Sequence, residues 1–116
     1  MEVTIEEFKP LSEGEHEGII ADVVYREATK GTQSFQYVDL PIKVDDTELT
    51  INYGMPFKEI VTPNSKLGRF LERTGHKIGQ KINMESFKGK RVKIFTENTK
   101  TSEGMIFANI KSITVL

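Results

Sequence analysis

The sequence predicts an all-β domain that carries one short helix. In several segments apolar and polar residues alternate strictly, which is the period of a strand with one buried face. Only one stretch, residues 62–76, changes to helical spacing. The length of 116 residues and the hydrophobic fraction of 37% are typical of one compact domain. We therefore expect a single domain over residues 1–116, in which the acidic, irregular residues 1–15 form a lead-in.

The first three strands are expected to form a meander. Residues 15–27 are rich in β-branched side chains, and their apolar residues fall on both parities, as in one long, bent strand. After a polar turn around Gly31, residues 34–44 alternate strictly, and Asp45-Asp46 then marks a turn before a third strand over residues 47–53. The alternation in the second strand predicts that four side chains point into the core: Val38, Leu40, Ile42 and Val44.

The helix and the last two strands complete the expected fold. Thr62 to Ser65 offer N-cap and first-turn chemistry, an apolar stripe follows, and Gly75 is placed to end the helix. Residues 91–97 alternate with Val92 and Ile94 inward, and after a loop over 98–104 a last strand runs over 105–116. Three strands, a helix and two strands is the element order of the oligonucleotide/oligosaccharide-binding (OB) fold, a five-stranded Greek-key barrel.

The composition argues against several classes of protein. The chain has no cysteine, which excludes disulfides and thiolate chemistry, and no apolar run approaches the roughly 20 residues that cross a bilayer. The acidic residues 1–7 lack the pattern of a signal peptide, so we expect a cytoplasmic protein without a membrane partner. The two histidines, His16 and His76, stand in no spacing motif, so we expect neither a metal site nor a cofactor.

One face of the expected barrel combines aromatic and basic side chains. In an OB-fold, nucleic acid crosses strands two and three and is flanked by the loops after strands one and four. Phe35 and Tyr37 stand two residues apart on strand two, so both rings share one side of the sheet, where two bases can stack. Lysine, arginine and glutamine side chains near them can pair with phosphates, and Phe95 lies on the same side of its strand: Lys30, Gln33, Lys43, Arg91, Lys93 and Lys100.

Other interpretations of the same residues remain open. Outward aromatic residues on a strand are also typical of a cross-strand pair or a subunit contact, and loop lysines are usually solvated surface. Phe95 would alternatively pack under the amino-terminal segment. A net charge of −1 favours a protein-interaction or homo-oligomeric assembly module over a strong phosphate binder. The expected partner is therefore single-stranded DNA, or RNA, with a second copy of the chain or another protein as the alternative.

No pattern in the sequence indicates catalysis or a small-molecule substrate. The serines lack a G-x-S-x-G elbow, and Asp45-Asp46 is a turn. The segment Phe87-Lys88-Gly89-Lys90-Arg91-Val92 shares only a Gly and a Lys with a P-loop and lacks the following Ser or Thr. We expect a protein that is not an enzyme.

The chain also resembles a family of small phage and prophage proteins that are encoded near replication and recombination genes and generally taken as OB-fold single-stranded-DNA-binding proteins. The resemblance covers nearly the whole chain. It rests on four segments: Pro10-Leu11-Ser12-Glu13-Gly14-Glu15-His16, Thr29-Lys30-Gly31 before Phe35-Gln36-Tyr37-Val38, Leu67-Gly68-Arg69-Phe70-Leu71 with Gly75 after it, and Phe87-Lys88-Gly89-Lys90-Arg91-Val92. It implies binding of displaced single strands during phage DNA replication or strand annealing. Bacterial single-strand-binding proteins generally end in a disordered acidic tail, whereas residues 113–116 are typical of a strand, so tail-mediated recruitment of partners is not expected.

Overall fold

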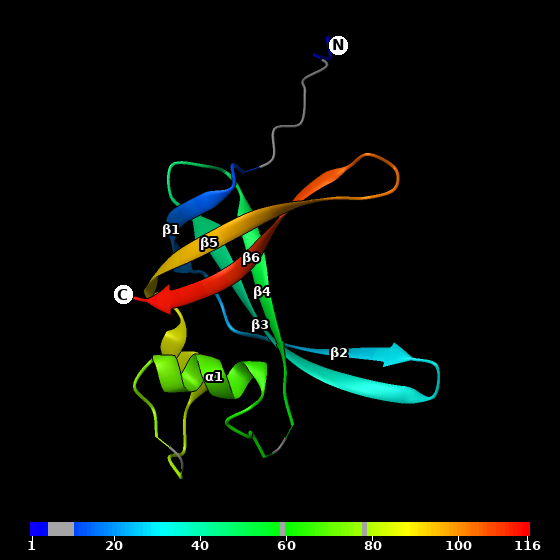
Figure 1. Cartoon of the computed structure of the whole chain (residues 1–116). Coiled ribbons are helices and arrows are strands. Elements are labelled where there is room, and N and C mark those ends of the chain that lie inside the picture. Colours follow the sequence, from blue (N-terminus) through cyan, green and yellow to red (C-terminus); the bar gives the residue numbers. More distant parts are fainter. Residues whose placement is uncertain (5–10, 59, 78) are drawn as a thin grey trace.

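The computed structural model describes residues 1–4, 11–58, 60–77 and 79–116 (Figure 1). Residues 5–10 of the expected lead-in, including Pro10, lie outside the described residues. Six strands, one α-helix and one short 3-10 helix make up the described fold: β1 (Gly14–Ile20), β2 (Val24–Lys30), β3 (Gln33–Val44), β4 (Thr50–Pro56), α1 (Lys66–Arg73), η1 (Met84–Phe87), β5 (Arg91–Lys100) and β6 (Ile106–Val115). The expectation of a mostly β protein with one helix between the third and fourth expected strands is confirmed.

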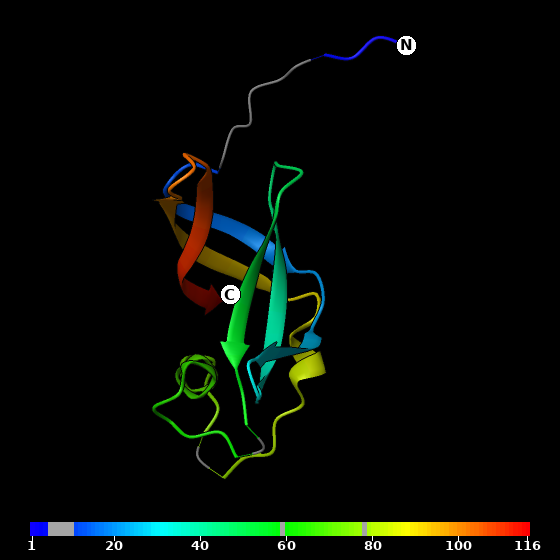
Figure 2. The ribbon, with the colours of Figure 1, turned by 90° about the vertical axis from the view of Figure 1, so that its right-hand side faces the viewer.

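The six strands form one antiparallel sheet around the long strand β3. On one edge of β3, β2 pairs with residues 33–39 and β1 with residues 42–44, while β4 pairs with the opposite edge. β1 also pairs with β5, and β5 with β6, so the strand order is β2-β3-β1-β5-β6 with β4 beside β3. Among the described residues no ladder joins β4 to β6, so the sheet is open between these two strands (Figures 1 and 2).

The expectation of one strand over residues 15–27 is wrong, because the chain leaves the sheet at residues 21–23 and forms two strands there. The Ala21 N–H donates to the Pro41 carbonyl at 2.8 Å, and the Asp22 carboxylate accepts from the Val23 N–H. Ile20 and Val23 are both buried although they differ in parity. This step in the backbone explains why apolar residues fall on both parities of the segment, and it raises the expected five strands to six.

Two other strand boundaries differ from the expected ones. The third expected strand over residues 47–53 is observed as β4, three residues later, because Thr47 belongs to the turn. Its hydroxyl donates to the Val44 carbonyl and accepts from the Leu49 N–H, both at 3.0 Å. At the other end of the molecule, β5 runs three residues beyond Glu97 and pairs with β6 up to Lys100, with a register shift between Phe95 and Thr96. The hairpin formed by β5 and β6 is therefore longer than expected.

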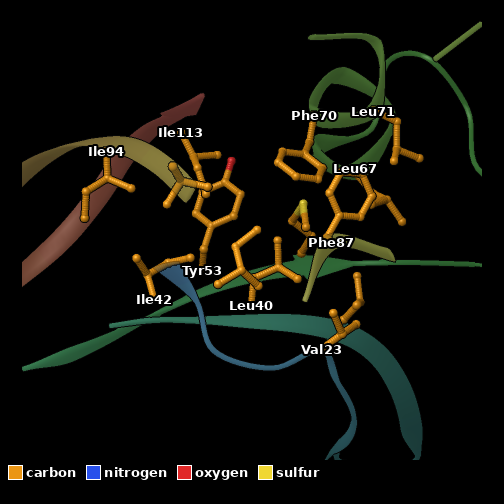
Figure 3. Packing of buried hydrophobic residues seen from close by; sticks show 14 of the residues in the cluster. Val23, Leu40, Ile42, Tyr53, Leu67, Phe70, Leu71, Phe87, Ile94 and Ile113 are labelled. Atoms are coloured by element: carbon orange, nitrogen blue, oxygen red, sulfur yellow. The ribbon is translucent and has the colours of Figure 1, made fainter. Parts of the chain in front are cut away.

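The core lies inside the curved sheet, and α1 covers one end of it (Figure 3). The six side chains expected to point inward are all buried: Val38, Leu40, Ile42, Val44, Val92 and Ile94. Phe70 of α1 packs between Tyr53 of β4 and Phe87 of η1, with ring centroids 6.3 and 5.2 Å apart (Figure 3). Contacts of this kind between aromatic rings stabilise by more than their buried area. They fix α1 across the end of the sheet.

The helix begins and ends on local hydrogen bonds. The Ser65 hydroxyl accepts from the Gly68 N–H at 3.0 Å, which places the N-cap inside the expected Thr62 to Ser65 segment. Gly75 has φ of +90°, and its N–H donates to the Glu72 carbonyl, so the expected stop at this glycine is confirmed. In the part of the chain that the structure describes, no helix is long and apolar enough to cross a membrane.

Candidate nucleic-acid interface

Two hairpins project from the same side of the molecule (Figures 1 and 2). β2 and β3 form the first, a two-stranded arm that turns at Gly31-Thr32, where Gly31 has φ of +66°. β5 and β6 form the second, which turns over residues 101–105. The two expected binding loops are thus the ends of two β-hairpins.

One face of the first hairpin carries the predicted aromatic residues. Phe35 pairs with Ala28, and Tyr37 pairs with Arg26, so these four side chains share a face of the ribbon. Phe35 is 40% exposed, whereas Tyr37 is half-buried. We name this surface the arm face and define it by eight residues: Val24, Arg26, Ala28, Lys30, Gln33, Phe35, Tyr37 and Asp39.

The ring of Tyr37 is covered on one side by Arg26. The Cζ atom of Arg26 lies 4.3 Å from the centroid of the Tyr37 ring, within cation–π distance. The Arg26 Nε donates to Asp39 Oδ2 at 2.7 Å, and Asp39 is only 7% exposed. This hydrogen bond raises the pKa of Arg26 above its usual value. Arg26, Tyr37 and Asp39 therefore form one unit on the arm face.

Gly54 of β4 makes room for this unit. Gly54 stands opposite Asp39 in the β3–β4 register. A Cβ at this position would lie 2.9 Å from Asp39 Oδ1 and 3.7 Å from an Arg26 guanidinium nitrogen. The carboxylate occupies the space that a side chain on β4 would take. Lys66 of α1 donates to the carbonyl oxygen of the same glycine at 2.9 Å, and partial burial lowers the pKa of Lys66.

The predicted basic residues on β5 face carboxylates. Arg91 forms an ion pair with Asp45, which raises the pKa of Arg91, and Lys93 lies 3.4 Å from Glu15 of β1. The protein's own carboxylates therefore offset part of the positive charge of both side chains. Phe95, two residues further along the strand, is 51% exposed and stands opposite Glu15 on β1.

Three predicted lysines have no ion pair within the described residues: Lys30, Lys43 and Lys100. Lys30 lies at the end of the arm, and Lys100 lies at the end of the β5–β6 hairpin. Lys43 stands opposite Ile19 of β1, which in turn stands opposite Arg91 of β5. Lys43 and Arg91 are thus two strands apart in one row, about 10 Å.

The eight predicted residues do not gather at one point. Lys30, Phe35 and Tyr37 lie on the arm face, whereas Lys43 lies near the other end of β3, about 27 Å from Phe35 at 3.4 Å per residue. Lys43 joins the β5 group of Arg91, Lys93 and Phe95, and Lys100 stands apart at its hairpin tip. The candidate interface is an extended path along β3, with a second branch at β5.

Sequence reasoning missed Arg26. It stood on the expected long first strand, where nothing showed which residue of strand two it would face. The signal was the short turn: pairing Lys30 with Gln33 across Gly31-Thr32 places Arg26 opposite Tyr37 when the register is counted back.

An apolar surface lies at the opening of the sheet. Met105, Ile106 and Phe107 are 54%, 38% and 46% exposed at the start of β6. Between this segment and β4 runs a groove, whose apolar lining comes from β4, from β6 and from the segments just before β1 and β4: Leu11, Leu49, Ile51, Ile106, Phe107 and Ala108. This surface was not among the expected sites.

Within the described ranges no group of three or more His, Asp or Glu side chains is arranged to hold a metal ion. The comparisons with known proteins add no identification: no family model and no curated protein matches this chain.

Proposed function

We propose that this chain binds single-stranded DNA with little sequence preference and without catalysing a reaction. The arm face is the observation that carries the proposal, because it combines the exposed ring of Phe35, the Arg26 and Tyr37 pair and the unpaired Lys30. Stacking of a base on such groups is worth about 1–3 kcal/mol and accepts any base, since every base has a π-face.

The strand pairing supports an OB-fold as the frame of this site. If β1 and β2 are counted as one interrupted first strand, that strand pairs with the second and fourth strands, as in an OB-fold. Nucleic acid in such a fold crosses strands two and three, here β3 and β4. The hairpin turns at residues 31–32 and 101–105 would then flank the bound strand.

The charges predict a moderate affinity for single-stranded DNA. The net charge is −1, and the two cations on β5 are engaged by Asp45 and Glu15. Stacking then contributes more to binding than phosphate contacts. A sequence-tolerant binder of this kind suits displaced single strands. The resemblance to phage and prophage proteins is our reason for proposing a role in DNA replication or recombination in the bacterial cytoplasm.

The test is a titration of the purified full chain against fluorescent oligo-dT at low salt. We expect binding, and we expect Phe35→Ala combined with Tyr37→Ala to weaken it by about 2 kcal/mol or more, roughly 30-fold. The matched control is Thr29→Ala combined with Gln36→Ala on the opposite face of the arm, which should bind as the wild type does. Absence of wild-type binding at low salt would overturn the proposal.

A second candidate, a protein-interaction or homo-oligomeric assembly module, is favoured by the exposed Met105, Ile106 and Phe107 beside the open sheet. Exposed apolar groups next to unpaired strand edges are typical of association surfaces. Sedimentation of the wild type and of Ile106→Ser combined with Phe107→Ser decides between the two. If these substitutions change the sedimenting species and the wild type does not bind oligonucleotides, the assembly function replaces the first candidate.

A further inference from the structure

We infer that the stacking surface at Tyr37 is the guanidinium plane of Arg26, backed by the tyrosine ring and held in place by Asp39. The inference rests on the proposed function and names what the site recognises there: the face of an unpaired nucleobase. It makes Arg26 a binding residue and Asp39 a positioning residue.

The distance between Arg26 and Tyr37 leaves no room for a base. Atoms in contact lie about 3.5–4 Å apart, so a base inserted between the two groups would separate them by about twice that distance. The observed separation is 4.3 Å. The outer side of the guanidinium stays accessible, because the Arg26 side chain is 46% exposed. Planar guanidinium groups are established stacking partners for bases in single-stranded nucleic acids.

Asp39 keeps Arg26 in this position when a ligand arrives. The Asp39 side chain is 10% exposed and its carboxylate accepts from the Arg26 Nε–H at 2.7 Å, while a second guanidinium nitrogen lies 3.4 Å from Oδ1. If Arg26 turned away to a phosphate, it would leave a largely buried carboxylate without its partner, which is costly. The absent side chain of Gly54 preserves the space for this pair.

The ion pair with Asp39 also affects the two properties of Arg26 differently, since it offsets the positive charge and leaves the flat guanidinium surface available. Because Asp39 offsets the positive charge, Arg26 offers a flat, polarisable surface with little net attraction for phosphate. A contact with a base face does not release counterions, whereas a contact with a phosphate does. The stacking role and a phosphate role for Arg26 therefore differ in the salt dependence of binding.

The experiment measures oligo-dT affinity across a salt series for the wild type, Arg26→Lys, Arg26→Ala and Tyr37→Phe. Lysine keeps the charge and loses the plane, so we expect Arg26→Lys to weaken binding about fivefold or more, nearly as much as Arg26→Ala. The slope of log affinity against log salt should stay unchanged in both. Tyr37→Phe keeps the ring beneath the guanidinium and should bind as the wild type does.

Asp39→Ala tests the positioning role. Freed from the carboxylate, Arg26 would become available to a phosphate, so the salt slope should steepen by about 0.7 while affinity at high salt falls. A purely structural loss would lower affinity without steepening the slope. A strand of abasic spacers supplies a further control, because it has phosphates and no bases, and Arg26→Lys should leave its binding unchanged.

Three outcomes separate this inference from the proposed function. Wild-type binding that Arg26→Lys retains in full overturns the inference and leaves the function intact. A salt slope that becomes shallower by about 0.7 in Arg26→Ala and recovers in Arg26→Lys assigns Arg26 to a phosphate and likewise overturns it. No wild-type binding at low salt overturns the function itself, and the inference with it.

Discussion

Gly68 in α1 is required by a close approach of two backbone segments. Glycine inside a helix normally costs about 1 kcal/mol relative to alanine. Here a Cβ would lie 2.0 Å from the Thr62 carbonyl oxygen and 3.0 Å from Pro63 Cα, both backbone atoms that cannot rotate away. The steric conflict outweighs the gain in helix propensity, so the usual effect of Gly→Ala should reverse its sign.

We therefore predict that Gly68→Ala destabilises the protein by about 1–3 kcal/mol, measured as a lower urea midpoint at unchanged slope. The control is Glu72→Ala, an exposed position on the same helix, which should stay within about 0.5 kcal/mol of the wild type. A higher midpoint for Gly68→Ala would show that the loop before α1 does not press on the helix as described.

The site residues show that the face of a strand can be predicted from the sequence, whereas ion-pair partners on other strands cannot. Alternation placed Phe35 and Tyr37 on one face, because the period of a strand is local information. It could not show that Arg91 faces Asp45, which is 46 residues away, or that Lys93 faces Glu15. Those neighbours depend on which strands pair and in what register, so the sequence overstated the cations available on β5.

At the scale of elements, α1 depends on one side chain at its start. The Ser65 hydroxyl accepts from the Gly68 N–H at 3.0 Å and donates to the Thr62 carbonyl at 2.8 Å. The helix is only eight residues long, and it carries Leu67, Phe70 and Leu71 into the core. Loss of the cap should therefore lower the free energy of unfolding of the whole domain.

We expect Ser65→Ala to lower the free energy of unfolding by about 1 kcal/mol, and Ser65→Asp, which keeps an acceptor for the Gly68 N–H, to restore most of it. Thermal or urea unfolding followed by circular dichroism measures both. Ser102→Ala, in the exposed β5–β6 turn, serves as the serine control and should have no effect. Equal losses for the alanine and aspartate variants at position 65 would contradict the capping role.

The strands were predictable where one face is buried and the other is not. This applies to β3 and to the start of β5, whose inward residues are all buried. Residues 15–27 were harder, because a step in the backbone at 21–23 shifts the inward parity from Ile20 to Val23. A local pattern cannot distinguish such a step from a strand with two buried faces.

The edges of β4 and β6, the two strands that border the opening of the sheet, are unequally protected. On β4, the Lys66 ammonium bonds the Gly54 carbonyl, and Pro56 has no N–H to offer. Charged and proline residues at an edge discourage pairing with other chains. β6 has a single charged residue, Lys111, which is paired with Glu97 at 3.1 Å. The edge of β6 is therefore less protected against pairing with another chain than the edge of β4.

For the whole molecule, the charge arrangement predicts a shallow salt dependence of binding. Lys30, Lys43 and Lys100 are the candidate cations outside ion pairs in the described structure. Each phosphate contact to a single strand contributes about −0.7 to the slope of log affinity against log salt, so we expect a slope of about −2.

Fluorescence titration of oligo-dT at four or more salt concentrations measures this slope. Lys30→Ala should make it shallower by about 0.7. Lys77→Ala, an exposed lysine in the loop after α1, is the matched control. A wild-type slope steeper than about −4 would mean that Arg91 and Lys93 leave their carboxylates and bind phosphates.

The two-residue turn at the end of the arm constrains how this hairpin can change in length. Adding one residue to each strand would keep the pairing but move the present tip pair, Lys30 and Gln33, to the opposite face. Adding two to each strand would keep their orientation and extend the surface by about 7 Å. Insertions in this hairpin, whether natural or engineered, should therefore preserve binding only in multiples of four residues.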